Sequence, residues 1–238
     1  MSLKGLIGRT GGKSRLKKKI RAMIPPHTTY IEPFVGGGSV FFSAPADPNI
    51  KEVINDKDKE VAQIYLDVKN FGDKITDIKP PTKEEFNRLR DKKNFSSPLE
   101  RLKRNLILSL YSFRSDRRNF AFSKAREPVI HTRGRTQKRY DKYKERLKNT
   151  RILNQDYKTV IKKYDNPNAF IYLDPPYSTA GENNDYNSND VPIEEIINLL
   201  KTVKGKFILS YDNNATAKKL ARDSGFKVLT VTNTTMVS

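Results

Sequence analysis

Residues 169–177 read Ala-Phe-Ile-Tyr-Leu-Asp-Pro-Pro-Tyr, and the interpretation of the whole chain starts from them. The first five residues are apolar, aromatic or β-branched, a pattern typical of a short buried strand. Asp174 stands where that strand ends, and the two prolines after it lack a backbone N–H and force a rigid, extended exit. A carboxylate, a backbone carbonyl and an aromatic ring are therefore held at the carboxyl end of a strand, the edge at which open α/β sheets bind ligands.

Three groups in this stretch suit a flat ring that carries an amino group. The carboxylate of Asp174 and the carbonyl of Pro175 can both accept a hydrogen bond from such an amine. The ring of Tyr177 can stack on the face of a base. We therefore take Asp174, Pro175 and Tyr177 as candidate catalytic residues.

The composition limits the class of protein. The 238 residues include 46 Lys or Arg and 27 Asp or Glu, which gives a net charge of +19. This excess favours a polyanionic partner, most often nucleic acid, although a basic protein adapted to an unusual cytoplasm would share it. The absence of cysteine excludes disulfides and thiolate metal sites, and two histidines argue against a histidine metal site or triad. Because we find no long apolar run and no signal peptide, we expect a soluble, intracellular protein with no membrane partner.

Strand and helix patterns alternate in both terminal parts of the chain. The alternation is typical of a mostly parallel sheet with helices on both faces. Helices are predicted near 14–23, after Asp56 to about 71, and over 192–203 and 214–223. Strands are predicted over 28–34, 52–55, 151–153, 169–173, 206–210 and 226–232.

The alternation of strands and helices stops between residues 72 and 149, and we interpret this segment as an insertion. Helical patterns occur near 82–91, 98–111 and 136–148, and residues 112–134 are predicted to form a hairpin or an irregular arm. Residues 100–151 hold 17 Lys or Arg and 5 Asp or Glu, so most of the net charge lies here. We predict one catalytic domain from residues 1–71 and 150–238, with residues 72–149 inserted as a second, mainly helical domain.

Basic residues alternate with aromatic ones in the arm of the insertion, without helical spacing. Lys and Arg neutralise phosphates, and Arg also reads guanine edges in the major groove. The alternative, a solvated helix face, suits residues 136–148 better than the arm. We favour Arg117 or Arg118 for base reading because they fall at the expected tip of the hairpin. The candidate nucleic-acid-binding residues are Arg114, Arg117, Arg118, Lys124 and Arg126.

A glycine run follows the first predicted strand and opens a helix, the setting in which glycines let a ligand approach the backbone. Asp56 follows the second strand, where a carboxylate can bind both hydroxyls of a ribose or can simply cap a helix. Asp156 and Tyr157 follow the third strand, where they suit an adenine amino group and ring or, alternatively, a cap and a core aromatic. Because Asp56, Asp156 and Asp174 all follow strands, we expect them along one edge of the sheet.

Residues 8–14 imitate a phosphate-binding P-loop, but the spacing is wrong. The motif requires a glycine five residues before Gly12, and position 7 is Ile. A nucleotide hydrolase is therefore disfavoured.

Taken together, these motifs resemble the N6-adenine DNA methyltransferases of the Dam type. The resemblance runs from Gly5 to about Tyr211 and rests on motifs in a fixed order. They are Gly-Gly-Lys at 11–13, Glu-Pro-Phe-Val-Gly-Gly-Gly-Ser at 32–39, Asn-Asp at 55–56, Gln-Asp-Tyr at 155–157 and Asp-Pro-Pro-Tyr at 174–177. It implies a Rossmann-like, S-adenosylmethionine-dependent catalytic domain with an inserted target-recognition domain at 72–149.

The same resemblance implies the ligands and the residues that hold them. S-adenosylmethionine is the expected cofactor, without a metal, and a flipped adenine of double-stranded DNA is the expected acceptor. Asp174 and Pro175 are expected to bind the target amine. The residues expected to bind the cofactor are Gly12, Lys13, Glu32, Phe34, Gly36, Gly38, Ser39, Asp56, Asp156, Tyr157 and Asp174.

The chain departs from this family at two places, and two other functions stay open. The insertion lacks the Asn-Val-Pro-Phe-Gly-like hairpin of members that read GATC, so no target sequence is predicted. The family usually continues past its sixth strand into a seventh, antiparallel one, and the sequence given ends at Ser238, soon after the predicted strand 226–232; either this sequence is shortened or the sheet is finished unusually. Methylation of cytosine N4 uses similar chemistry, and a nucleic-acid-binding homologue without catalysis is the alternative outside the enzymes.

Overall fold

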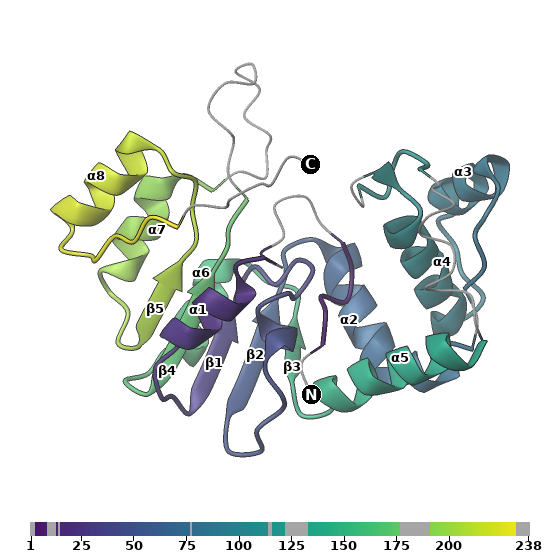
Figure 1. The fold of residues 1–238 in the computed structure, drawn as a ribbon, viewed down its shortest axis with the longest axis horizontal. Coiled ribbons are helices and arrows are strands. Elements are labelled where there is room, and N and C mark those ends of the chain that lie inside the picture. The colour runs from purple at the N-terminus through teal and green to yellow at the C-terminus, as the bar shows by residue number, and fades with distance from the viewer. Residues whose placement is uncertain are drawn as a thin grey trace.

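The protein is described by a computed structural model that covers residues 3–8, 13, 15–76, 78–113, 116–121, 133–176 and 191–231, without the side chains of 133–138. Its centre is a five-stranded, all-parallel sheet with the order β3-β2-β1-β4-β5 (Figure 1). The strands are β1 (Thr29–Glu32), β2 (Lys51–Asn55), β3 (Arg151–Leu153), β4 (Ala169–Leu173) and β5 (Lys206–Leu209). The predicted parallel α/β sheet is therefore confirmed.

The strand order reverses at the centre of the sheet. β1 pairs with β2 on one side and with β4 on the other, and Thr29 lies opposite both Lys51 and Ala169. The chain builds outward from β1 to β3 and returns to add β4 and β5 on the other side. Ligands of open parallel sheets bind at the carboxyl ends of the strands where such a reversal occurs, which is the end that carries Glu32 and Asp174.

Both faces of the sheet are buried. Neighbouring residues of a strand point to opposite faces, and in β1 and β2 they join two different hydrophobic clusters. Tyr30 and Ile54 join one hydrophobic cluster, whereas Ile31 and Val53, their neighbours in the same strands, join a second one. The helices of these parts of the chain are α1 (Lys17–Met23), α2 (Lys59–Phe71), α6 (Tyr157–Tyr164), α7 (Ile193–Leu200) and α8 (Ala215–Asp223), with short 3₁₀ helices η1 (Phe41–Ser43) and η2 (Gly72–Lys74).

The insertion supplies α3 (Lys83–Asp91), α4 (Pro98–Leu110) and α5 (Arg133–Leu147). Local signals fix the starts of two of them. Thr82 makes a capping box with Glu85, and Ser97 caps α4 just before Pro98. In Figure 1, α3 and α4 stand to one side of the sheet, beyond α2.

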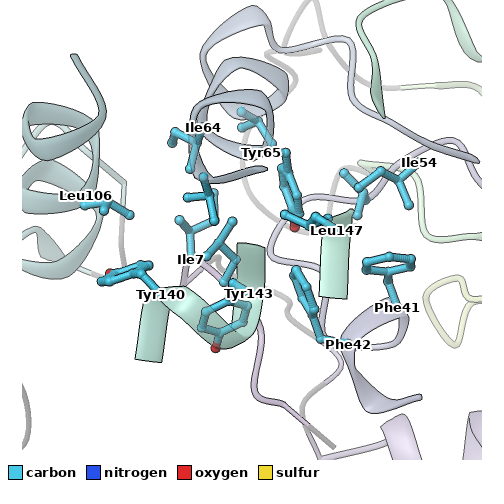
Figure 2. Packing of buried hydrophobic residues seen from close by; sticks show 14 of the residues in the cluster. Ile7, Phe41, Phe42, Ile54, Ile64, Tyr65, Leu106, Tyr140, Tyr143 and Leu147 are labelled. Atoms are coloured by element: carbon cyan, nitrogen blue, oxygen red, sulfur yellow. The ribbon is translucent and has the colours of Figure 1, made fainter. Parts of the chain in front are cut away.

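The described part of the insertion shares its hydrophobic core with the sheet. Tyr140 and Tyr143 of α5 lie near Ile7, Ile64 and other residues of that cluster, as Figure 2 shows. Arg146 is buried and holds α5 to β2 through a two-pronged ion pair with Glu52, with both N···O distances 2.6 Å. Its guanidinium also lies over the ring of Phe41, 4.0 Å from the centroid. α5 is therefore anchored to the sheet.

The predicted strand at 226–232 is wrong over its described residues. Residues 226–231 form no strand, and Leu229 and Val231 are exposed, at 58% and 39%. The segment is rich in β-branched residues, but a strand needs a neighbour that accepts its hydrogen bonds, and β5 pairs only with β4 within the described residues. The first helix also begins later than predicted, at Lys17, and the helix after the glycine run is only the three-residue η1. No helix in the described ranges is long and apolar enough to span a membrane.

We predict that Gly38→Ala destabilises the protein more than Gly225→Ala does. Both glycines have left-handed φ, +70° and +76°, which costs roughly 1–2 kcal/mol for other residues. At Gly38 a Cβ would also lie 2.5 Å from the Tyr65 hydroxyl and 2.9 Å from the Phe42 ring, whereas at Gly225 nothing lies within 4 Å. Overpacking adds about 1–3 kcal/mol, so denaturant unfolding should separate the two variants by that amount. Equal losses would contradict the packing described for the glycine loop.

Candidate active site at the carboxyl edge of the sheet

Acidic residues from four strands gather at one edge of the sheet. Glu32 is the last residue of β1, and Asp174 follows β4 directly. Asp56 follows β2 directly, and Asp156 comes three residues after β3. Because all five strands are parallel, these ends share one edge, as predicted for Asp56, Asp156 and Asp174.

Asp174 makes an ion pair with Lys13 in which Nζ lies 2.6 Å from Oδ1. The two side chains are only 13% and 21% exposed, for Lys13 and Asp174 respectively. Burial raises the pKa of Asp174, and the positive charge of Lys13 opposes that rise. Lys13 was predicted from sequence, but its contact with Asp174, 161 residues away, was not.

The prolines after Asp174 carry the chain out of the sheet. Pro175 is buried and Pro176 is exposed. The carbonyl of Pro176 accepts a hydrogen bond from Val191 N at 3.3 Å, so the chain returns to this point just before α7. Tyr177 and Gly12 lie outside the described residues.

Glu32 is the second buried acid of the edge. Its Oε2 accepts a 2.6 Å hydrogen bond from the hydroxyl of Tyr30. Burial raises the pKa of Glu32 to about 8. The hydrogen bond from Tyr30 lowers this pKa, and the neighbouring charge of Asp174 raises it. A buried acid beside Asp174, with a raised pKa, favours a ligand that brings positive charge to this edge.

The glycine loop is held from behind by the chain's own backbone. Leu6 N donates to Gly37 O at 2.8 Å, and a Cβ on Gly37 would lie 2.5 Å from Ile7 O. Gly36 and Gly38 have φ of +46° and +70°, a region that glycine adopts without strain. The run therefore needs glycine for its own folding, independent of any ligand. Ser39, the last residue of the predicted motif, is partly buried.

Asp56 closes this loop. Its Oδ2 accepts from Gly36 N at 2.9 Å, and its Oδ1 accepts from Asp58 N at 3.0 Å. The alternative that Asp56 caps a helix is wrong, because Asp58 is the cap of α2 and accepts from Glu60 N and Val61 N. The predicted contact of Asp56 with a ribose stays a prediction.

Asp156 and Tyr157 have the alternative structural roles, a helix cap and a core aromatic residue. Asp156 caps α6 by accepting from Lys158 N at 2.9 Å. The ring of Tyr157 lies 5.0 Å from that of Phe34, tilted by 37°, and its hydroxyl donates to Glu195. Glu195 of α7 was missed, because nothing in its local sequence links it to a residue 38 positions earlier. The cofactor roles of Phe34, Asp156 and Tyr157 stay predictions.

Residues 111–113 and 116–121 pair as the two sides of a hairpin, as predicted for the start of the arm. Phe113 N donates to Asn119 O at 2.8 Å, and Ser112 and Phe120 form an antiparallel bridge. Arg118 is exposed. Arg117 instead points into the protein, where its Nη2 lies 2.6 Å from Asp58 Oδ2. Arg114, Lys124 and Arg126 lie outside the described residues, and DNA contacts by any of the five stay a prediction.

The residues that the structure describes hold no group of three or more His, Asp or Glu side chains with the arrangement of a metal site. The acids at the sheet edge are instead engaged with Lys13, with backbone N–H groups and with Tyr30.

We predict that Glu32→Gln stabilises the protein at high pH. The folded pKa of Glu32 is raised to about 8 from an ordinary value of 4.5, so its contribution to stability is full below pH 4.5 and is lost as the pH rises through 8. Glutamine cannot ionise and still accepts from Tyr30. Urea unfolding should show the variant more stable than wild type at pH 9 by at least about 1 kcal/mol, with a smaller gain at pH 6. Glu145→Gln, at an exposed site, is the control; a difference for Glu32→Gln that does not change with pH would contradict the buried acid.

The same chain matches known proteins along nearly its whole length. Residues 10–237 match the family of D12 class N6 adenine-specific DNA methyltransferases. A type II methyltransferase of Methanocaldococcus jannaschii is 25% identical over 218 residues, which cover 79% of this chain and 74% of that protein. A type II methyltransferase of Lactococcus lactis subsp. cremoris is 26% identical over 253 aligned residues, with 94% and 87% covered.

A third relative carries a name that states its substrate. The DNA adenine methylase of Serratia marcescens is 28% identical over 184 residues, which cover 71% of this chain and 64% of that protein. The match over residues 10–237 spans the Asp-Pro-Pro-Tyr motif and the glycine loop, and the fold brings this loop and Asp174 to one edge. The chain therefore belongs to the D12 class of N6 adenine-specific DNA methyltransferases.

Proposed function

We propose that this enzyme transfers the methyl group of S-adenosylmethionine to the N6 amine of an adenine that is flipped out of double-stranded DNA. The observation that carries the proposal is the position of Asp174 and Pro175 at the end of β4, next to β1 and its glycine loop. The two groups proposed to accept the amine therefore follow β4, and the glycine loop proposed to bind the cofactor follows its neighbour β1, where the strand order reverses.

Asp174 and Pro175 prepare the target nitrogen. The lone pair of an aromatic amine is delocalised into the ring, so the amine is a weak nucleophile. Hydrogen bonds from its two N–H groups to the Asp174 carboxylate and the Pro175 carbonyl draw the hydrogens out of the ring plane. The nitrogen then directs a lone pair at the incoming methyl carbon. Such preorganised acceptors act by position and electrostatics.

The residues present fit S-adenosylmethionine by charge. When bound, this cofactor supplies an electrophilic methyl group on a positively charged sulfur. Glu32, buried with a raised pKa beside Asp174, suits the cofactor's positive amino group, and Lys13 suits its carboxylate. The Phe34 and Tyr157 rings suit packing on the adenine ring, with Asp156 toward its amino group and Asp56 toward the ribose.

The insertion at residues 72–149 is proposed as the DNA-recognition domain. It holds most of the positive charge, and the described hairpin residues 116–121 include the exposed Arg118. Flipping the adenine costs roughly a few kcal/mol, and stacking on Tyr177 would offset about 1–3 kcal/mol of it. Arg114, Lys124 and Arg126 are proposed as further phosphate or base contacts.

Label transfer from tritiated S-adenosylmethionine to duplex DNA tests the proposal. Digestion of the product and chromatography of the nucleosides should place the label in N6-methyladenine. Label in N4-methylcytosine would reassign the base, and no label would leave a DNA-binding protein without catalysis. Sequencing of the methylated DNA would give the target site in the same experiment.

We predict that Asp174→Ala lowers kcat by at least ~10²-fold while the protein stays folded, because the amine loses a preorganised acceptor. The thermal midpoint is measured alongside, because the variant also takes the carboxylate away from the largely buried Lys13. Asp47→Ala, at an exposed loop position, is the matched control. A near-normal kcat in Asp174→Ala would remove Asp174 from the catalytic role.

We predict that Lys13→Gln moves the acid limb of the pH–rate profile to higher pH. Asp174 must be ionised to accept the amine, and activity is lost as the pH falls through its pKa. Removing the nearby positive charge favours the neutral carboxyl, so the pKa rises further. The measurement is kcat at saturating substrates from pH 5 to 9 for both proteins. An unshifted acid limb would show that the pair with Lys13 does not hold the charge of Asp174 during turnover.

A further inference from the structure

Arg117 has a backbone conformation that its side chain does not favour. Its φ is +61°, the only left-handed value at a non-glycine position among the described residues. The strain costs roughly 1–2 kcal/mol and persists only where surrounding contacts hold it. Arg117 N donates to Ser112 Oγ at 2.8 Å, which fixes this conformation within the hairpin. The result is that the guanidinium turns toward α2.

The guanidinium meets two acids at the start of α2. Nη2 lies 2.6 Å from Asp58 Oδ2, and Nη1 lies 3.2 Å from Glu60 Oε2 without the geometry of a hydrogen bond. The Arg117 side chain is only 16% exposed, against 33% for Asp58 and 53% for Glu60. The bond to Asp58 is therefore the main one, and this guanidinium is poorly placed to reach a DNA phosphate or base.

Asp58 carries the contact from the hairpin to the glycine loop. Its side chain caps α2, and its backbone N donates to Asp56 Oδ1 at 3.0 Å. Asp56 in turn accepts from Gly36 N at 2.9 Å. Hairpin, helix cap and glycine loop are thus joined by three successive hydrogen bonds through Arg117, Asp58 and Asp56.

Charge explains why this arrangement needs an arginine. Asp56, Asp58 and Glu60 place three acids within five residues of chain, and like charges at this spacing repel. Arg117 neutralises the central one. A second arginine, Arg104 of α4, lies 3.1 Å from Glu60 Oε1 and is fixed by the carbonyls of Leu89 and Arg90.

We propose that Arg117 is a positioning residue for cofactor binding. It fixes Asp58, and through Asp58 the carboxylate of Asp56 and the glycine loop, in the arrangement that receives the cofactor's ribose. The inference rests on the proposed function, and it departs from the sequence-based expectation that Arg117 reads a base.

The test compares two neighbouring arginines, Arg117→Gln and Arg118→Gln. Calorimetry gives the affinity for S-adenosylmethionine, with and without a duplex that contains the target site, and fluorescence anisotropy gives the affinity for that duplex. Arg117→Gln should weaken cofactor binding by about tenfold, the scale of one charged hydrogen bond, and leave DNA affinity without cofactor unchanged. Arg118→Gln should weaken DNA binding and leave cofactor binding unchanged.

Two further variants separate positioning from general stability. Arg117→Lys keeps the charge and should recover part of the cofactor affinity. In an Asp58→Asn background, Arg117→Gln should have little further effect on cofactor affinity, because the pair is already broken. In steady-state kinetics the loss should appear in KM for the cofactor and not in KM for DNA. Arg117→Lys also serves if Arg117→Gln folds poorly.

Several results would overturn the inference. Weakened DNA binding with unchanged cofactor affinity in Arg117→Gln would make Arg117 a DNA contact, as first expected. A lower thermal midpoint with both affinities unchanged would make it a structural brace only. Wild-type protein that binds no S-adenosylmethionine would overturn the proposed function, and this inference with it, whereas wild-type binding that Arg117→Gln retains overturns this inference alone.

Discussion

Parallel pairing of β1 with both β2 and β4 is the constraint on which the rest of this structure depends. Because the three strands run in the same direction, their carboxyl ends meet, and the residues that follow them are brought together from positions more than a hundred residues apart. The glycine loop after β1, Asp56 after β2 and Asp174 after β4 share an edge for this reason alone. Hydrophobic clusters on both faces of the sheet hold these strands together.

Burial of charge at this edge sets the chemistry of the site. Glu32 and Asp174 both have raised pKa values because they are withdrawn from water, and Lys13 compensates one of them. Such a site gains from a ligand that brings positive charge, which a sulfonium cofactor does. In the proposed reaction, the same desolvation strengthens the hydrogen bonds that Asp174 accepts from the amine, since electrostatic interactions are stronger in a low-dielectric site. Under that proposal, burial of charge is the common physical cause of cofactor preference and amine activation.

The positive charge of the insertion serves two purposes. Several of its cations are paired with acids of β2 and α2 and hold α4 and α5 to these elements, as Arg146 does with Glu52 and Arg101 with the buried Asp67. Arg117 is paired in the same way at the cap of α2. Among the described residues, exposed cations such as Arg118 are available to attract a polyanion. The net charge of +19 already subtracts every acid, so these ion pairs leave it unchanged and decide only which cations stay exposed.

The sequence by itself determined the fold class and the positions of the acids. Apolar runs such as 169–173, with proline or glycine after them, are local signals of buried strands, and caps such as Thr82 and Ser97 mark helix starts from three or four residues. Only the tertiary structure decided which side chains meet. The pair of Lys13 with Asp174, the bond of Tyr157 to Glu195 and the turn of Arg117 toward Asp58 join distant segments, so no local pattern contains them. The failure of residues 226–231 to form a strand has the same origin, because β propensity becomes a strand only where another strand supplies its hydrogen-bond partners.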